Sequence, residues 1–113
     1  MHLPEQACRL CVYIGESDKW QGAPLYEAIV LKARELHLAG ATVLRGPMGF
    51  GASSRLHTAK ILRLSEDLPI VIEIVDTREK VDLLISHIDA MMGDGLVTLE
   101  DVQVVRYRAA PKP

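Results

Sequence analysis

The feature that most restricts the fold is an uninterrupted apolar run in the second half of the chain. Residues 68–75, LPIVIEIV, are aliphatic or β-branched except for Pro69 and Glu73. Such a run predicts a strand that is covered on both faces or lies at the centre of a sheet. A carboxylate buried there needs a partner, so we expect Glu73 to pair with a nearby arginine.

The elements on either side of this strand predict the fold class. They are strands at 8–15, 41–44 and 96–107, and helices at 23–39 and from residue 76 to Gly93. The order strand, helix, strand, strand, helix, strand predicts an α+β, ferredoxin-like βαββαβ sandwich, with a four-stranded antiparallel sheet and two helices on one face. At 113 residues, the chain is expected to form one domain, 1–113.

Local signals place the helix ends. Pro24 suits the first turn of the first helix, and Gly40 suits a left-handed residue after its last turn. Asp76 suits the N-cap of the second helix, because Glu79 stands three residues later as in a capping box.

The two helices leave one face of the expected sheet uncovered. Apolar residues make up 49% of the chain, and several strand positions on both faces are apolar. We therefore expect the open face to meet another copy of the chain.

Charge and hydropathy exclude several classes of partner. The formal net charge is −2 and no basic run occurs, which disfavours nucleic-acid binding. No apolar stretch reaches the length of a membrane span, and residues 1–7 lack the features of a signal peptide. The expected location is the cytoplasm, without direct membrane insertion.

The cysteines Cys8 and Cys11 lie in one predicted strand. Positions three apart on a strand point to opposite faces, so we expect two buried, unpaired thiols rather than a redox or zinc pair.

No catalytic or metal-binding pattern is present. The four histidines are not at metal-ligand spacing, and no nucleophile elbow or Walker-type phosphate loop occurs; the histidines are His2, His37, His57 and His87. We expect neither a resident metal nor an enzyme activity.

A long glycine-rich and polar segment separates the second and third strands. It begins GPMGFG at 46–51, which indicates unusual torsions or close approach of another group. We expect a mobile segment at about 46–67, and its candidate functional side chains are Ser53, Ser54, Arg55, His57 and Lys60. The alternative is a solvated loop without a role. Glu16, Asp18 and Lys19, in the first connection, either hold a ligand or stabilise the turn.

A candidate anion site lies near the end of the chain. The tight turn GDG, 93–95, directs backbone N–H groups outward. Arg106 and Arg108, two apart in the last expected strand, would project to the same face. The alternative is that these arginines pair with Glu100 or Asp101.

Taken in order, several motifs resemble those of PII signalling proteins. They are GATV (40–43), GFG (49–51), LP (68–69), IEIV (72–75), GDG (93–95) and RYR (106–108). The chain is most similar to a PII-like branch catalogued as domain-of-unknown-function family 190. ESDKWQGAPLYEAIV (16–30), GATVLRGPMGFG (40–51) and LSEDLPIVIEIVD (64–76) are typical of it, and the resemblance spans about residues 8–108.

The resemblance implies a function and a set of residues. PII proteins are homotrimers that bind adenine nucleotide between subunits, and a long T-loop contacts a regulated protein, for which a membrane transporter is one candidate here. By position, the loop base would supply Gly49, Phe50 and Gly51. The phosphate-facing turn would be Gly93, Asp94 and Gly95, with Arg106 and Arg108 on the phosphates. Gly40, Ala41 and Thr42 would lie near the adenine of the adjoining subunit.

Departures from the family pattern narrow the expected ligand. Leu96 stands where PII proteins have a lysine after GDG, and Ile70 or a gap replaces a second lysine. These losses favour ADP or AMP over ATP. No tyrosine occurs between 52 and 67, so regulation by ligand is expected rather than by tyrosine modification.

The rival interpretation is a CutA-type trimeric protein that binds a metal through His57 or the cysteines.

Overall fold

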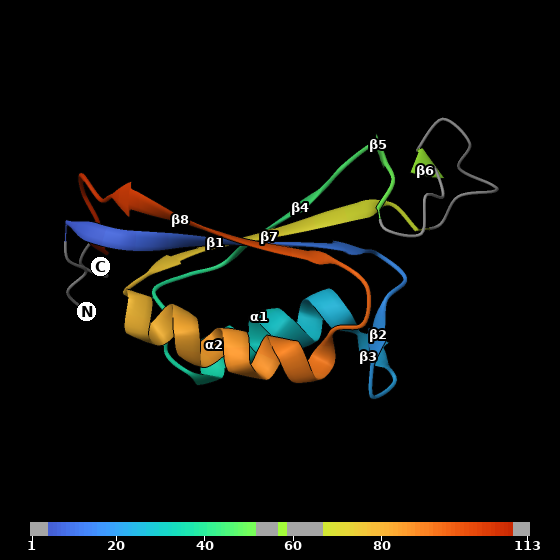
Figure 1. The fold of residues 1–113 in the computed structure, drawn as a ribbon, viewed down its shortest axis with the longest axis horizontal. Helices are drawn as coiled ribbons and strands as arrows, with labels where there is room; N and C mark the ends of the chain where they lie inside the picture. The colour runs from blue at the N-terminus through green and yellow to red at the C-terminus, as the bar shows by residue number, and fades with distance from the viewer. Residues whose placement is uncertain (1–4, 52–56, 59–66, 110–113) are drawn as a thin grey trace.

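The computed structural model describes residues 5–51, 57–58 and 67–109. It shows one four-stranded sheet with two helices against one face (Figure 1). The main elements are β1 (Gln6–Gly15), α1 (Leu25–Glu35), β4 (Thr42–Arg45), β7 (Pro69–Asp76), α2 (Arg78–Met91) and β8 (Leu96–Gln103). Two-residue strands form two small hairpins, β2 (Lys19–Trp20) with β3 (Ala23–Pro24) and β5 (Met48–Gly49) with β6 (His57–Thr58).

The order of the large sheet is β4-β7-β1-β8, and each neighbouring pair is antiparallel. This is the ferredoxin-like βαββαβ arrangement, so the predicted fold class is confirmed. The apolar run predicted as a central strand is β7, which pairs with β4 on one side and β1 on the other.

The core lies between the sheet and the helices. Alternate residues of β7 and β1 point into it, so that Ile72 lies opposite Val12 and Ile74 opposite Leu10. Each of these four side chains is at most 1% exposed. Ile29 of α1 packs against the same cluster, together with Val81, Leu84 and Ile88 of α2. Burial of one such side chain contributes about 1.5–3 kcal/mol, which fixes the helices on this face.

The ends of α1 differ from the prediction of a helix over 23–39. Pro24 is the N-cap, outside the first turn, and the helix ends at Glu35. The left-handed residue is His37, with φ 61°, rather than Gly40. The His37 N–H bonds the Arg34 carbonyl at 3.1 Å and the Leu38 N–H bonds the Ala33 carbonyl at 3.0 Å, which is a Schellman motif. Burial of Leu38 against the core ends the helix at Glu35, five residues before Gly40.

The start of α2 also corrects the prediction. Its N-cap is Thr77, whose hydroxyl accepts the Lys80 N–H at 3.3 Å, so Asp76 and Glu79 do not form a capping box. Asp76 is the last residue of β7 and points toward the helix side, where its side chain is 2% exposed. Its carboxylate accepts the Ala39 N–H at 2.7 Å and the Thr77 N–H at 2.6 Å.

Strand β8 is shorter than the predicted 96–107 because its pairing with β1 ends at Gln103 opposite Gln6. Residues 104–109 have no regular structure. The Val104 N–H still bonds the Glu5 carbonyl at 2.6 Å. Arg106 and Arg108 therefore do not lie on a strand, and the argument that strand geometry places them on one face was wrong.

The cysteine and Glu73 predictions are confirmed. Cys8 and Cys11 are both buried and free, and they lie on opposite faces of β1. Glu73 lies on the open face, where its carboxylate is 3.8 Å from the Arg9 guanidinium. Arg9 also binds Glu100 across the sheet, and this hydrogen bond raises the pKa of Arg9 above its usual value.

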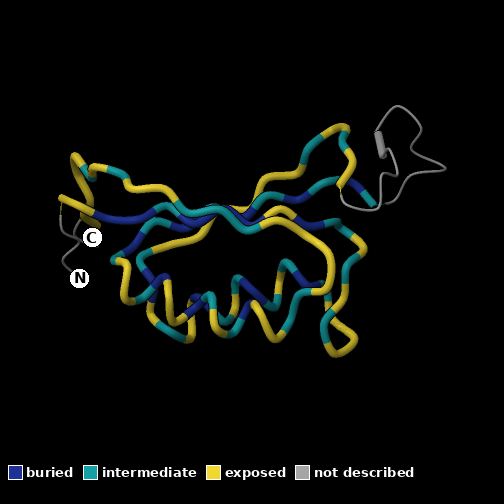
Figure 2. The backbone as a smooth tube through the Cα atoms, in the orientation of Figure 1, coloured by how far each residue is buried: buried dark blue, intermediate teal, exposed yellow. Residues whose placement is uncertain are grey.

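The open face carries an apolar row at one end of the sheet. Tyr13 lies opposite both Val71 and Leu96, and Val71 lies opposite Leu44. Tyr13 is 41% exposed, Leu44 50% and Leu96 56%. Figure 2 shows the same contrast, with buried residues along the central strands and an exposed β4. Apolar side chains at this level of exposure fit a surface that another chain covers.

A hairpin joins the end of β1 to α1. Its turn contains Gln21 and Gly22, with φ values of 49° and 80°, as expected for a tight two-residue connection. Trp20, the one tryptophan of the sequence, packs against the core from this hairpin. The Leu25 N–H bonds the Asp18 carbonyl at 2.8 Å and ties the hairpin to the start of α1.

Candidate functional site

The residues assigned from the sequence gather at opposite ends of the sheet (Figure 1). We call the end that contains Gly15, Arg45, Pro69 and Leu96 the loop end, and the end that contains Cys8, Asp76 and Gln103 the tail end. The loop end carries Gly49, Phe50, Gly51, Gly93, Asp94 and Gly95, and the tail end carries Arg106 and Arg108. Gly40 and Ala41 precede β4, whose first residue Thr42 pairs with Glu73 near the middle of the sheet. Strand β8 separates the two groups, and at about 3.3 Å per residue its length is about 25 Å.

Pro69 explains two of the glycines at the base of the 46–67 segment. A Cβ on Gly46 would lie 2.9 Å from the Pro69 ring and one on Gly49 would lie 3.0 Å from it. The Gly46 N–H also donates to the Pro69 carbonyl at 2.8 Å. These glycines permit close approach of a proline, and among the described glycines only Gly22 and Gly95 have a positive φ. The alternative explanation of this motif, unusual backbone torsions, does not hold, because Gly46, Gly49 and Gly51 have no positive φ.

The turn after β1 ties the loop end together. The Glu16 N–H bonds the Leu68 carbonyl at 2.8 Å, and the Ser17 N–H bonds the Asp67 carboxylate at 2.8 Å. The Glu16 carboxylate forms an ion pair with Arg45, at the end of β4. Asp18 accepts the Gly15 N–H at 3.0 Å. Glu16 and Asp18 thus have structural partners, which supports the turn-stabilising alternative for both.

The GDG turn contains two different kinds of glycine. Gly95 has φ 148°, and a Cβ there would lie 2.9 Å from the Tyr13 carbonyl oxygen. Gly93 has open space around its would-be Cβ, as do Gly40 and Gly51. Asp94 is exposed. Gly95 is required by the fold, whereas the backbone at Gly93, Gly40 and Gly51 is open to an approaching group.

The arginines at the tail end are exposed. Among the described residues, no ion pair involves Arg106 or Arg108, and Glu100, one of the carboxylates that could have neutralised them, binds Arg9 instead. Arg106 and Tyr107 line an open depression of about 330 Å³ with Glu5, Gln103, Val104 and Val105. Exposed guanidinium groups are suited to bind phosphate or carboxylate.

Tyr107 makes a contact beside the candidate residues that the sequence reasoning missed. Its hydroxyl donates to the Ala39 carbonyl at 3.0 Å, so the tail that carries the two arginines contacts the connection that precedes Gly40. The motif RYR contained the signal, but only its charged residues were given a role. The partner of Tyr107 is a backbone atom 68 residues away, which no local pattern reveals.

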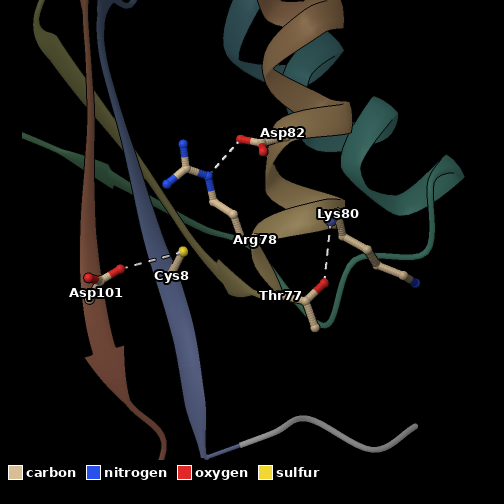
Figure 3. A network of polar contacts seen from close by, with 6 residues as sticks. All are labelled: Cys8, Thr77, Arg78, Lys80, Asp82 and Asp101. Carbon is tan, nitrogen blue, oxygen red and sulfur yellow. Dashed lines mark hydrogen bonds and ion pairs between the residues drawn. The ribbon is translucent and has the colours of Figure 1, made fainter.

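A polar network lies beside these residues on the helix side of the sheet (Figure 3). The Cys8 thiol is 4.0 Å from the Asp101 carboxylate, and Arg78 binds Asp82 at 2.9 Å along α2. The hydrogen bond to Asp82 raises the pKa of Arg78, with a smaller contribution from Cys8. The two pairs have their partners within the sheet and within α2 respectively, so these groups have structural partners already.

The remaining candidates concern the 46–67 segment and metals. Ser53, Ser54, Arg55 and Lys60 lie outside the described residues, and His57 is described only through its backbone pairing with Gly49.

Within residues 5–51, 57–58 and 67–109, no three His, Cys, Asp or Glu side chains converge on a possible metal position. In the same ranges, neither helix is long and apolar enough to cross a membrane.

The family is shown by comparison with known sequences. A model of domain-of-unknown-function family 190, described as uncharacterized ACR, matches residues 7–104. The chain belongs to this family. A UPF0166 protein of Aquifex aeolicus is 35% identical over 96 residues, which cover 85% of this chain and 90% of that protein. A UPF0166 protein of Methanocaldococcus jannaschii is 31% identical over 98 residues, or 86% and 90% of the two chains.

Solved structures place this member of family 190 in the PII-like fold. CPII of Thiomonas intermedia K12, bound to ADP and bicarbonate, aligns with a TM-score of 0.64 at 19% identity and covers 89% of this chain and 90% of its own. A second CPII structure, described as a nitrogen regulatory PII-like protein bound to ADP, AMP and bicarbonate, aligns with a TM-score of 0.65, also at 19% identity, with the same coverage. The resemblance to PII proteins that the motifs indicated is confirmed.

Proposed function

We propose that this chain is a non-enzymatic, PII-like regulator that binds an adenine nucleotide between the subunits of a homotrimer. ADP or AMP is favoured over ATP, because Leu96 and Ile70 stand where lysines would bind further phosphate charge. The CPII structures, which share the fold, are described as bound to ADP and AMP. The 46–67 segment would contact the regulated partner, and a membrane transporter is one candidate.

The separation of the candidate residues is the observation that carries this proposal. The phosphate-facing turn at 93–95 and the arginines at 106 and 108 lie at opposite ends of β8. They can serve one ligand only if the loop end of one subunit meets the tail end of another. Such a contact is head-to-tail, and head-to-tail contacts give a closed ring when the rotation between subunits closes. A trimer is the smallest ring built from heterologous contacts alone, and it is the assembly that the resemblance to PII proteins implies.

The open face supports the same assembly. The apolar row of Leu44, Val71, Tyr13 and Leu96 is too exposed for an isolated chain and lies on the side away from the helices. In a ring of three chains, these rows would meet at the centre. Burial there would stabilise the assembly by about 25 cal/mol for each Å² of apolar surface removed from water.

The loop base would link nucleotide binding to the contact with the regulated partner. Gly49 lies on β5, which pairs with β6 inside the 46–67 segment, and Gly51 has open space beside its Cα. A nucleotide seated against this base would contact the backbone from which the segment departs. Ligand binding would then change which conformations the segment offers to a partner.

Calorimetry with ADP, AMP and ATP, combined with light scattering for the mass, tests the proposal. We expect a trimer that binds ADP or AMP. Arg106→Ala and Arg108→Ala should each weaken binding by about tenfold, as expected for loss of a hydrogen bond to a charged group. Arg34→Ala is the matched control, because Arg34 is an exposed arginine on α1 that is not among the candidate site residues. A monomer, or a trimer that gives no heat with any of the three nucleotides, would contradict the proposal.

A further inference from the structure

The connection between α1 and β4 is held from three directions. The Ala39 N–H donates to the Asp76 carboxylate at 2.7 Å, and the Ala39 carbonyl accepts the Tyr107 hydroxyl at 3.0 Å. The Lys80 ammonium group donates to the His37 carbonyl at 2.9 Å. These partners come from β7, the chain tail and α2, so three separate parts of the fold hold His37 and Ala39.

Asp76 is the rigid member of this arrangement. Within the described ranges it is the one charged residue that is buried, and both of its carboxylate oxygens accept a backbone N–H. A buried carboxylate is tolerated only when it is well hydrogen-bonded, so its position is strongly determined. The Ala39 backbone is therefore fixed relative to the sheet even without its contact to the chain tail.

Tyr107 attaches the tail to this fixed point. In the described part of the chain, residues 104–109 are bonded to the body at Val104, through the Glu5 carbonyl, and at Tyr107, through Ala39. Arg106 lies between these two points and Arg108 directly follows the second. Loss of the Tyr107 hydroxyl would leave both arginines beyond the last attachment.

The same hydrogen bond orients the backbone that follows Ala39. In a planar trans peptide the carbonyl and the next N–H point in opposite directions, so the Gly40 N–H points away from Tyr107. Gly40 is exposed, and its would-be Cβ has no atom within 4 Å. Among the described residues, the Gly40 N–H has no hydrogen-bond partner. It is therefore a free donor on an exposed residue that directly follows a fixed peptide.

We propose that Tyr107 is a positioning residue that joins the tail arginines and the Gly40 backbone into one preorganised half of the nucleotide cleft. This inference rests on the proposed function. The phenol touches neither the phosphates nor the base. It acts through Ala39 by holding two ligand-binding segments at a fixed spacing, which lowers the cost of ordering them when the ligand arrives.

Tyr107→Phe tests the inference, because it removes the hydroxyl and leaves the ring. Amide exchange without nucleotide should become faster at Val104, the residue of 104–109 whose N–H is hydrogen-bonded to the body, and at Ala39, whose N–H is bonded to Asp76, while the melting temperature stays within about 1 °C. ADP affinity should fall by about twofold to tenfold, the range of one net hydrogen bond. Tyr26→Phe is the control, since Tyr26 lies on α1 and its hydroxyl has no hydrogen-bond partner among the described residues.

A double-mutant cycle separates positioning from a general loss of order. If Tyr107 acts by placing the arginines, Tyr107→Phe should cost less affinity in an Arg106→Ala background than in the natural chain. Full additivity, or unchanged exchange and affinity in Tyr107→Phe, would overturn the inference. If the natural chain binds no nucleotide, the proposed function fails, and exchange at Val104 and Ala39 alone decides whether Tyr107 anchors the tail.

Discussion

The loop end and the tail end of the sheet are held together in different ways. At the loop end, backbone groups bond one another and a proline ring lies against two glycines, as in the Gly46–Pro69 contact. At the tail end, the side chains of Asp76 and Tyr107 bond the backbone of Ala39 from two sides. The loop end thus combines the close packing of a proline with hydrogen bonds of the turn after β1, whereas at the tail end side-chain hydrogen bonds converge on one backbone residue, Ala39.

The surroundings of each glycine, rather than the end of the sheet on which it lies, separate glycines needed by the fold from glycines open to a ligand. A Cβ would meet neighbouring atoms at Gly46, Gly49 and Gly95, but would meet nothing within 4 Å at Gly40, Gly51 and Gly93. Both kinds occur in the motifs that resemble PII proteins. A glycine motif is therefore not by itself a ligand contact, and each glycine has to be judged by what surrounds it.

The largest effect is expected at the tail end, from Asp76→Ala. The change leaves the N–H groups of Ala39 and Thr77 without their acceptor in a buried place, so the free energy of unfolding should fall by about 3 kcal/mol. Urea denaturation followed by circular dichroism measures this. The control is Asp89→Ala on the exposed side of α2. Equal effects of the two changes would show that side-chain hydrogen bonds do not hold the tail end.

The next-largest change in the free energy of unfolding is expected at the loop end, where two glycines of one turn can be compared. Gly95→Ala should lower the free energy of unfolding by about 1–3 kcal/mol, because of its φ of 148° and the nearby Tyr13 carbonyl. Gly93→Ala should be neutral or slightly stabilising, since its surroundings are open. Thermal unfolding of both variants gives the difference. A reversed order would mean that the fold does not require Gly95.

The smallest effect concerns the ion pair between Glu16 and Arg45. Both side chains reach solvent, with 26% and 53% exposure, so the pair should contribute about 0.2–1 kcal/mol and less at high salt. A double-mutant cycle with Glu16→Gln and Arg45→Met, measured at low and high salt, gives the coupling energy. A coupling above about 2 kcal/mol would show that charge contributes as much as packing to the loop end.

The fold was predictable because its signals are local and repeat along the chain. The run at 68–75 and the alternation of strands and helices were sufficient to give the ferredoxin-like class. The helix ends were misjudged where a tertiary contact decided them. Burial of Leu38 ends α1 early. The Asp76 carboxylate accepts the Ala39 N–H, so the N-cap of α2 is Thr77 and not Asp76, to which the local pattern assigned it.

The candidate site was predictable only in part. The motifs named its residues, but their placement at two ends of one chain depends on strand register. The end of β8 at Gln103 also removed the strand geometry expected for Arg106 and Arg108. The Tyr107 contact joins residues 68 apart through a backbone carbonyl, and such a partner has no signature in the amino-acid sequence.

Trp20 makes the two ends of the sheet optically distinct. It is the one tryptophan of the chain, and it sits on the hairpin that follows the turn at Gly15. Its emission therefore reports on the loop end without any label attached to the protein. A nucleotide titration followed by this emission, in the natural chain and in the Arg106→Ala variant, would show whether a ligand bound through the tail end also reaches the loop end.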